Sequence, residues 1–399
     1  MASVQASSPR PLLFELYTPM SDPFIDIRPY QNSEVRTVIE RISRSDALVG
    51  ALLRYRFASL PEWLHNVLIP VAKWRLQRQT SDIETVEDFQ RWLERWVTRL
   101  LDKTTTCVVV RGLENLSPDE GHLWISNHRD IAMDPTLINY SLHQAGWPTS
   151  RIAIGDNLLG HPDVADVMRL NKSFLVKRNI ANKREKLAAL MQLSDYIRHS
   201  LDEGVSVWIA QREGRAKDGI DVTDTAVLKM LALHGRGRKE SFSETMAALR
   251  PVPVSIQYEW DPCDLMKARE LVAKARDGSY CKEEGEDTRS LLTGVSGFKG
   301  TVYVDFGQPL APEEVESADT MAAAIDRQIR DMAEILPIHR AALALLQRRF
   351  AQYRELACGD VDTSLTEQLE QRIGDQDEAL QQQALTVYAM PLILQQGEP

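Results

Sequence analysis

One short stretch of the chain combines a histidine with two carboxylates close to it in sequence. The stretch is ISNHRDIAMDP, residues 125–135, and it holds His128, Asp130 and Asp134 directly after an apolar run. An imidazole, with an ordinary pKa of about 6.5, can take a proton from an alcohol near neutral pH. It does so best when a carboxylate binds its other ring nitrogen and stabilises the imidazolium. His128 with one of the aspartates is therefore a candidate general base, although a histidine near aspartates is more often structural.

The elements around His128 favour a catalytic interpretation. Residues 105–310 alternate short β-branched runs with helical patterns, and the seven strand candidates are TCVVVRG, LWIS, RIAIG, FLVKR, VSVWIAQ, VPVSIQYE and TVYVDFG. This alternation predicts an α/β domain with a mixed, largely parallel sheet flanked by helices. His128 would follow the second strand, at the carboxyl end, where open α/β sheets place their sites.

Two helical parts flank this α/β part. Residues 1–104 carry apolar residues at three- and four-residue spacing, as in SEVRTVIERISRSDALVGALLRYRF, and predict an N-terminal helical segment. Residues 311–399 are rich in Ala, Gln and Glu and predict two or three acidic helices that lie on the surface. The expected organisation is a helical segment 1–104, an α/β domain 105–310 and a C-terminal helical extension 311–399.

Tryptophan is concentrated in the N-terminal segment. Four of the eight tryptophans lie between residues 63 and 96, and residues 54–100 contain eight Lys or Arg against six Asp or Glu. Tryptophans beside cationic residues on amphipathic helices are typical of a membrane interface. The commoner explanation is a helical bundle with the tryptophans in its core, and we favour that explanation from the sequence.

Composition and charge narrow the classes of partner and compartment. A net charge of -10 argues against nucleic acid, because a phosphate backbone requires a basic surface. The four cysteines are scattered without a C-x-x-C pair, which fits a reducing compartment. The start MASVQASSPRPLLFELY does not resemble a secretory signal, and no window of 18 apolar residues predicts a transmembrane helix. We expect a cytoplasmic protein, with a peripheral membrane contact as the open alternative.

Four short motifs, in this order, resemble those of the glycerolipid acyltransferases, which comprise the glycerol-3-phosphate and 1-acylglycerol-3-phosphate acyltransferases. The first is Asn-His followed by Asp, here NHRDIAMD, and the second is a strand that ends in a basic residue, here NKSFLVKRN. The third is a strand before a Glu-Gly turn and basic residues, here WIAQREGRAKD, and the fourth is a Val/Ile-Pro strand, here RPVPVSI. Together the motifs cover about residues 105–310.

The resemblance implies direct acyl transfer. His128, oriented by Asp134, would take the proton of an acceptor hydroxyl, which attacks the thioester carbonyl of the donor. No covalent enzyme intermediate is implied, because the chain has no Gly-x-Ser-x-Gly elbow. Backbone N–H groups of the Glu213–Gly214 turn would stabilise the oxyanion. The donor would be acyl-CoA or an acyl carrier protein, and neither a metal nor another cofactor is implied.

The resemblance also implies an acceptor that carries a phosphate, either glycerol-3-phosphate or its 1-acyl derivative. A phosphate requires cationic side chains near the base. The basic candidates that follow the second and third motif strands are Arg178, Arg212, Arg215 and Lys217. Asn127 would position either His128 or the substrate.

The first motif departs from the family pattern in its spacing. The family has four residues between His and Asp, whereas five separate His128 from Asp134. We align on Asp134, because a wider turn between strand and helix can absorb one residue and because Pro135 follows it, as is frequent in the family. Asp130 is the competing partner, although an aspartate so close in sequence more readily binds local backbone N–H groups.

Three other functions are alternatives to acyl transfer. The chain contains His-Arg-Asp, Asp-Phe-Gly and Ala-Pro-Glu in the order found in protein kinases, but it lacks the glycine-rich loop, the Val-Ala-Ile-Lys strand and room for an activation loop. A non-catalytic lipid- or membrane-binding protein with an acyltransferase-like fold would explain the unusual spacing. A thioesterase would replace the alcohol by water, but the basic residues argue against it, because water needs no phosphate-binding group.

Overall fold

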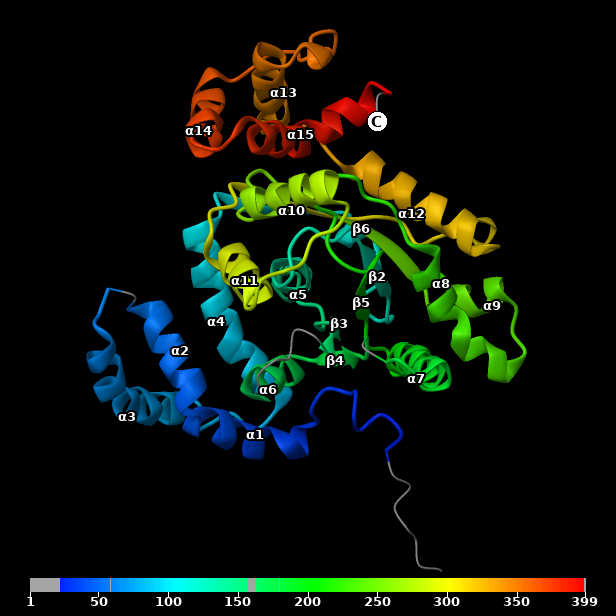
Figure 1. Ribbon diagram of the computed structural model, residues 1–399. Helices are drawn as coiled ribbons and strands as arrows, with labels where there is room; N and C mark the ends of the chain where they lie inside the picture. The colour runs from blue at the N-terminus through cyan, green and yellow to red at the C-terminus, as the bar shows by residue number, and fades with distance from the viewer. Residues whose placement is uncertain (1–21, 58, 157–161, 179, 398–399) are drawn as a thin grey trace, which may run out of the picture.

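The computed structural model describes residues 22–57, 59–156, 162–178 and 180–397, so the start of the chain lies outside the described residues. Its centre is a seven-stranded sheet in the order β1-β7-β6-β2-β5-β3-β4 (Figure 1). The strands are β1 (Cys107–Arg111), β2 (Leu123–Ser126), β3 (Arg151–Gly155), β4 (Ser173–Val176), β5 (Val207–Ala210), β6 (Pro251–Tyr258) and β7 (Thr301–Phe306). All seven strand candidates from the sequence are confirmed.

The sheet is mixed and mostly parallel, as predicted. β2 runs parallel to its neighbours β5 and β6, and β3 runs parallel to β4 and β5. β7 pairs with β6 in the antiparallel direction and with β1 in the parallel direction. Five strands therefore end at one edge of the sheet, and that edge carries the loop with His128.

Helices cover both faces of the sheet, which explains why its central strands are apolar throughout. Leu123 and Ile125 of β2 pack on one face with α7 (Lys183–Asp202), α8 (Thr225–Leu231) and α12 (Ala318–Met332). Trp124, between them in the sequence, packs on the other face with α5 (Met133–Gln144) and α4 (Val86–Thr104). The alternation follows from the two-residue period of a strand.

The N-terminal helices share a core with the α/β part. The remaining helices of this region are α1 (Asn32–Arg44), α2 (Asp46–Arg56) and α3 (Glu62–Gln79). Val35 and Ile39 of α1 pack with Phe89 of α4 and with Leu170, the last residue of α6 (Pro162–Leu170). The end of α4 also joins the core beneath the sheet through Leu101.

The interpretation of the tryptophans as core residues is wrong for three of the four. Trp63 and Trp74 of α3 are 66% and 60% exposed, and Trp96 of α4 is 46% exposed, whereas Trp92 packs beside Phe89. The reason is that α3 packs only against neighbouring helices along one side and buries a single residue, His65. Among the described residues, no helix is both long enough and apolar enough to cross a membrane.

The C-terminal extension differs from the sequence expectation in the number and burial of its helices. Four helices lie here: α12, which covers the sheet, α13 (Pro337–Arg349), α14 (Thr363–Ile373) and α15 (Glu378–Gln395). The last three form a layer over α10 (Asp264–Asp277), as Figure 1 shows. Their Leu and Ala side chains build a separate core that also contains Trp260, so these helices do not simply lie on the surface.

Candidate active site

His128 lies at the carboxyl end of the central strand β2. β2 ends at Ser126 and α5 begins at Met133, so the histidine is in the loop between strand and helix. Its side chain is 14% exposed, and the ring of Trp208 from β5 packs against it edge to face at 6.0 Å. The imidazole therefore packs against an apolar ring but remains partly accessible to solvent.

Asp134 orients this imidazole. His128 Nδ1 lies 2.8 Å from Asp134 Oδ2, and the carboxylate is completely buried at the start of α5. Because a carboxylate accepts, Nδ1 carries the proton of this hydrogen bond and Nε2 is left as the basic nitrogen. Among the described residues, no group hydrogen-bonds to Nε2, so this nitrogen can receive a proton from a substrate.

Three further donors hold the Asp134 carboxylate. The backbone N–H groups of Arg129 and Asp130 donate to Oδ2 at 2.7 and 2.9 Å, and the Tyr258 hydroxyl donates to Oδ1 at 2.7 Å. With four donors in total, both oxygens are fixed. Hydrogen bonds to an ionised carboxylate are stronger than those between neutral groups, so the carboxylate is a rigid, charged support for the ring.

Asp130, the competing partner, caps the helix instead of binding the imidazole. Its Oδ1 accepts the backbone N–H groups of Ala132 and Met133 at 3.0 and 2.8 Å. Burial, and then the neighbouring Asp134, raise the pKa of this carboxyl group. The loop between β2 and α5 thus accommodates the five intervening residues, and α5 begins early enough to bring Asp134 to His128.

A glycine from a distant helix makes room for this longer loop. Gly294 belongs to α11 (Glu286–Ser296), and a β-carbon at that position would lie 1.9 Å from Asp130 Oδ2. Such a distance is far below van der Waals contact. The Asp130 carboxylate therefore occupies the space that a side chain at position 294 would need.

Tyr258 is a site residue that the sequence analysis missed. It is the last residue of β6, the strand beside β2, and burial followed by the charge of Asp134 raises its pKa well above the usual range. The hydroxyl therefore stays protonated and donates to Asp134. The available signal was position: Tyr258 follows the RPVPVSI motif at the same sheet edge as His128.

Asn127 holds the loop and has little capacity left for a substrate. Its side chain is buried, and its Oδ1 accepts the backbone N–H of Ile256 on β6 at 2.8 Å. Its Nδ2 donates to Ile256 O at 3.1 Å and to Asp221 Oδ2 at 3.2 Å. Of the two roles considered from the sequence, the geometry favours positioning of His128.

The loop after β5 folds against the histidine. The backbone N–H of Ala216 donates to the His128 carbonyl oxygen at 2.8 Å, and the N–H of Gln211 donates to Ser126 O at 2.8 Å. Between them, Glu213 and Gly214 form an exposed turn in which Gly214 has a φ of 78°, a conformation that glycine adopts without strain. The turn is thus anchored on both sides next to the base.

The four predicted phosphate ligands have different environments. Arg178 Nη1 lies 3.5 Å from Glu213 Oε1, which brings the end of β4 to the loop after β5. Arg215 donates to Ser290 Oγ at 2.8 Å, while Arg212 has no ion pair among the described residues. Lys217 is paired with the buried carboxylate of Glu270 on α10, and burial lowers the pKa of its ammonium group.

The partner of Lys217 changes its expected role. A lysine bound to a buried glutamate is costly to withdraw, because Glu270 would then keep Lys274 as its remaining cationic partner in a largely buried position. The sequence could not show this, since Glu270 lies far along the chain. Arg178, Arg212 and Arg215 are the three cations that remain available to an anionic ligand.

Two further polar contacts fix the loop that carries His128. Arg129 Nη2 lies 2.6 Å from Asp221 Oδ2, and the buried Lys267 ammonium of α10 donates to Arg129 O at 2.7 Å. Among the described residues, no three His, Cys, Asp or Glu side chains come together as a metal site. The arrangement is suited to proton transfer by an oriented imidazole.

The geometry is that of a general-base site, with an oriented histidine at the end of the central strand of a mixed α/β sheet. Residues 107–254, from β1 into β6, match the model of the acyltransferase family. This part of the chain is similar to that family, in line with the resemblance of the four sequence motifs.

Several known proteins are similar to this chain. A glycerol-3-phosphate acyltransferase of Pseudomonas putida is 24% identical over 79% of this chain and 40% of its own length. One of Xanthomonas campestris is 24% identical over 69% of this chain and 33% of its own length. The chain thus spans less than half of the curated relatives it matches. The 1-acyl-sn-glycerophosphate acyltransferase structure from Thermotoga maritima covers 73% of this chain and 95% of its own, at 16% identity and a TM-score of 0.38.

Proposed function

We propose that the protein is an O-acyltransferase of phospholipid biosynthesis. It moves a fatty acyl group from an acyl thioester to a hydroxyl of glycerol-3-phosphate or 1-acylglycerol-3-phosphate. The observation that carries the proposal is the imidazole of His128, bound through Nδ1 to the buried Asp134 and free at Nε2, within an acyltransferase-family domain. The names of the curated relatives support a phosphoglycerol acceptor.

The proposed reaction is a direct transfer. Nε2 of His128 removes the proton of the acceptor hydroxyl as its oxygen bonds to the thioester carbonyl carbon. The carbon–sulfur bond then breaks, and the imidazolium returns the proton to the leaving thiolate. Asp134 stabilises the positive ring between the two steps. The backbone N–H groups of Glu213 and Gly214 would stabilise the oxyanion of the tetrahedral intermediate.

The arginines near this turn would bind the acceptor phosphate. Arg178 and Arg215 come from β4 and from the loop after β5, on both sides of the turn that packs on His128. A guanidinium donates two parallel hydrogen bonds to a phosphate, and one such charge-assisted contact contributes about 1.5 to 3 kcal/mol. Arg178→Ala and Arg215→Ala should raise the acceptor KM and leave donor binding unchanged.

A product screen tests the function. The purified protein would be incubated with acyl-CoA or acyl carrier protein thioesters and with each acceptor, and the products would be identified by mass spectrometry. Acylated glycerol phosphate supports the proposal. Thioester consumption at an equal rate without acceptor would identify a thioesterase, and no consumption with any donor would identify a non-catalytic protein.

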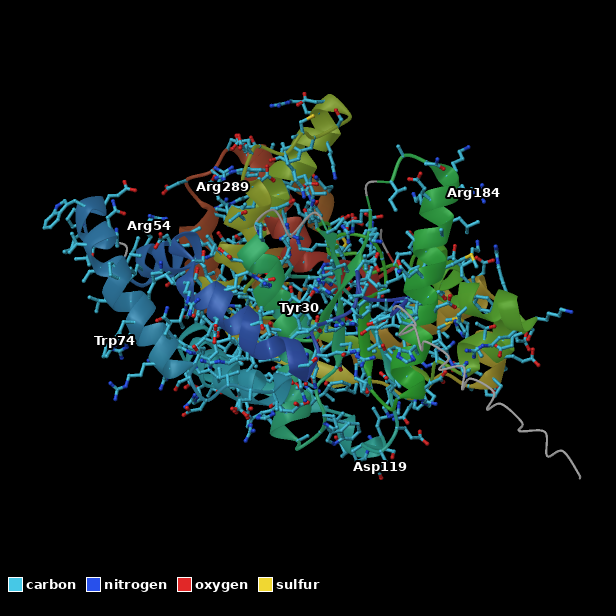
Figure 2. The ribbon with its side chains drawn as sticks, turned by 90° about the horizontal axis from the view of Figure 1, so that it is seen from below. Tyr30, Arg54, Trp74, Asp119, Arg184 and Arg289 are labelled. Carbon is cyan, nitrogen blue, oxygen red and sulfur yellow. The ribbon has the colours of Figure 1, made fainter. Side chains whose placement is uncertain are left out.

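A peripheral membrane contact is part of the proposal. Trp63, Val67, Val71 and Trp74 are all exposed and recur at spacings of four, four and three, so they form one stripe along α3. Trp74 lies on the outer side of the molecule in Figure 2, with the guanidinium of Arg78 over its ring. An exposed aromatic stripe beside arginines suits the interface of an anionic bilayer.

Vesicle sedimentation tests this contact. The wild-type protein should sediment with vesicles that contain anionic lipid, and a Trp63→Ser/Trp74→Ser variant should remain in the supernatant. Phe298→Ser is the matched control, because Phe298 is equally exposed but lies outside α3, between α11 and β7. Equal sedimentation of the two variants would contradict the assignment of the stripe.

A further inference from the structure

The first turns of α7 form a projecting basic surface. Residues 181–188 are all exposed, and Arg184 lies at the outer end of the helix in Figure 2. Residues 177–192 contain five Lys or Arg and one acidic residue, in a protein with a net charge of -10. We call Lys183, Arg184 and Lys186, together with the apolar residues described next, the α7 surface.

Two apolar side chains complete this surface. Leu187 is 43% exposed and Met191 is 38% exposed, and they follow each other by one helical turn on the same side of α7. Met191 also lines a groove of about 600 Å³ beside the helix, together with Ala188 and Phe24. A partly apolar centre with charged residues around it is the usual composition of a protein–protein interface.

The cations of the α7 surface have no partner within the described protein. Lys183, Arg184 and Lys186 form no ion pair with any described residue, although most other basic residues near the sheet do. They also lie at the positive end of the helix dipole, where cations are unfavourable. The helix itself is already capped, because Asn182 Oδ1 accepts the N–H groups of Arg184 and Glu185. The helix dipole therefore disfavours these three cations where they stand, and their side chains are available to an external anion.

The α7 surface lies at the edge of the sheet that holds the histidine. α7 follows β4, which runs parallel to β3 and hence in the same direction as β2. Arg178, at the end of β4, is paired with Glu213 in the loop after β5, and Ala216 of that loop donates to His128 O. A short series of contacts thus connects Arg178, five residues before Lys183 in the sequence, to the loop that carries the base.

We propose that the α7 surface docks the acyl donor in the form of an acyl carrier protein, a small acidic protein that presents its thioester on a flexible arm. The inference rests on the proposed acyltransferase function. The basic residues of the surface stand exposed on the first turns of a helix, which suits another protein, whereas a nucleotide such as coenzyme A requires a pocket that encloses it. The surface also has no aromatic residue, unlike the α3 stripe, and so does not resemble a membrane contact.

Kinetics with two donors test the proposal. The variant is Lys183→Glu/Arg184→Glu/Lys186→Glu, and the control is Lys103→Glu/Arg348→Glu/Arg354→Glu, which makes the same charge change at exposed cations elsewhere. With one acyl chain and one acceptor, the α7 variant should raise KM for the acyl carrier protein roughly ten-fold at low salt, because steering by complementary charge is lost. Its KM for acyl-CoA and its kcat should equal those of the control.

Direct binding separates this inference from the proposed function. Fluorescence anisotropy of labelled holo acyl carrier protein measures docking without turnover, so docking is tested even if no donor is consumed. Weaker binding to the α7 variant, with normal binding to the control, supports the proposal that the α7 surface docks the carrier protein. Equal loss with both donors, an unchanged KM for the carrier protein, or a loss of vesicle binding with normal carrier binding would each overturn it.

Discussion

At the scale of single residues, Asp134 and His128 should be functionally inseparable. Asp134→Asn replaces the acceptor of the Nδ1 proton by an amide, which favours the wrong tautomer or breaks the contact. We expect His128→Ala to lower kcat by roughly 100-fold or more and Asp134→Asn to lower it nearly as much. Initial rates and circular dichroism of both variants check this, and near-normal turnover in a folded variant would contradict the mechanism.

Tyr258 offers a finer test at the same scale. In Tyr258→Phe the carboxylate loses the one donor to Oδ1 that the described residues supply, which leaves a buried acceptor unpaired at a cost of about 1 to 3 kcal/mol. With one donor fewer, the carboxylate should hold the imidazolium more strongly, so release of the proton to the leaving group slows. We expect kcat to fall roughly ten-fold while KM is unchanged, and the acidic limb of the pH–rate profile to move to higher pH.

A purely structural role of Tyr258 predicts something else. Loss of stability alone would lower the amount of active enzyme and would leave the pH profile where it is. The distant Tyr280→Phe variant is a suitable control, because the partly buried Tyr280 hydroxyl likewise donates to a carboxylate, that of Glu286.

The candidate site could be predicted in part from sequence. His128 and Asp134 were found because a local motif holds both, and the turn between strand and helix brings them together. The contacts of Asn127 and Lys217 could not be predicted, because their partners Ile256 and Glu270 come from other elements. Sequence spacing describes neighbours along the chain, whereas a buried polar group must find its partner wherever the fold places one.

At the scale of elements, the packing of α11 on the loop before α5 can be tested by a double-mutant cycle. Gly294→Ala places a methyl group against the Asp130 carboxylate and should destabilise the protein by about 1 to 3 kcal/mol. Asp130→Ala removes the cap of α5 and should cost about 1 kcal/mol. In the double variant the methyl group has room, so the two costs should not add.

Urea unfolding measures all four proteins of this cycle. A double variant less stable than the wild type by the full sum of the two single costs would show that α11 does not contact the carboxylate. Catalysis should survive Asp130→Ala better than Asp134→Asn, because Asp130 binds only the helix backbone.

The elements themselves were predictable to different degrees. All seven strands were found, because buried strands of a parallel sheet are short, continuous β-branched and apolar runs between turns. α13 and α15 were misjudged as surface helices, since their many Ala residues and Gln-rich ends hide a continuous apolar side. α3 was misjudged in the opposite sense, because a sequence cannot show whether an apolar stripe meets a partner helix or solvent.

At the scale of the whole molecule, the C-terminal helices are coupled to pH through His339. This residue lies in the first turn of α13, and its Nδ1 accepts the N–H of Leu336 at 3.1 Å. Burial, and then the nearby charges of Arg129 and Arg340, lower its pKa to about 3. The folded protein therefore holds His339 neutral, and this contribution to stability is complete above the ordinary pKa and is lost as the pH falls from 6.5 toward 3.

The free energy of unfolding should therefore decrease as the pH falls. Between pH 7 and pH 5, this single group should remove on the order of 2 kcal/mol of stability. His339→Gln keeps an acceptor for Leu336 and should flatten the pH dependence by that amount, whereas His143→Gln, at a partly exposed histidine, should not. Urea unfolding at the two pH values measures the difference, and parallel curves for wild type and His339→Gln would refute it.

The space that Gly294 leaves for Asp130 has a consequence for the sequences of related chains. The loop of five residues and the glycine on α11 depend on each other, although they lie far apart in the sequence. An insertion in that loop would have been tolerated only where this position was already glycine, or became glycine soon afterwards. In an alignment of relatives, chains with five residues between His and Asp should therefore carry glycine here, and chains with four should admit larger side chains.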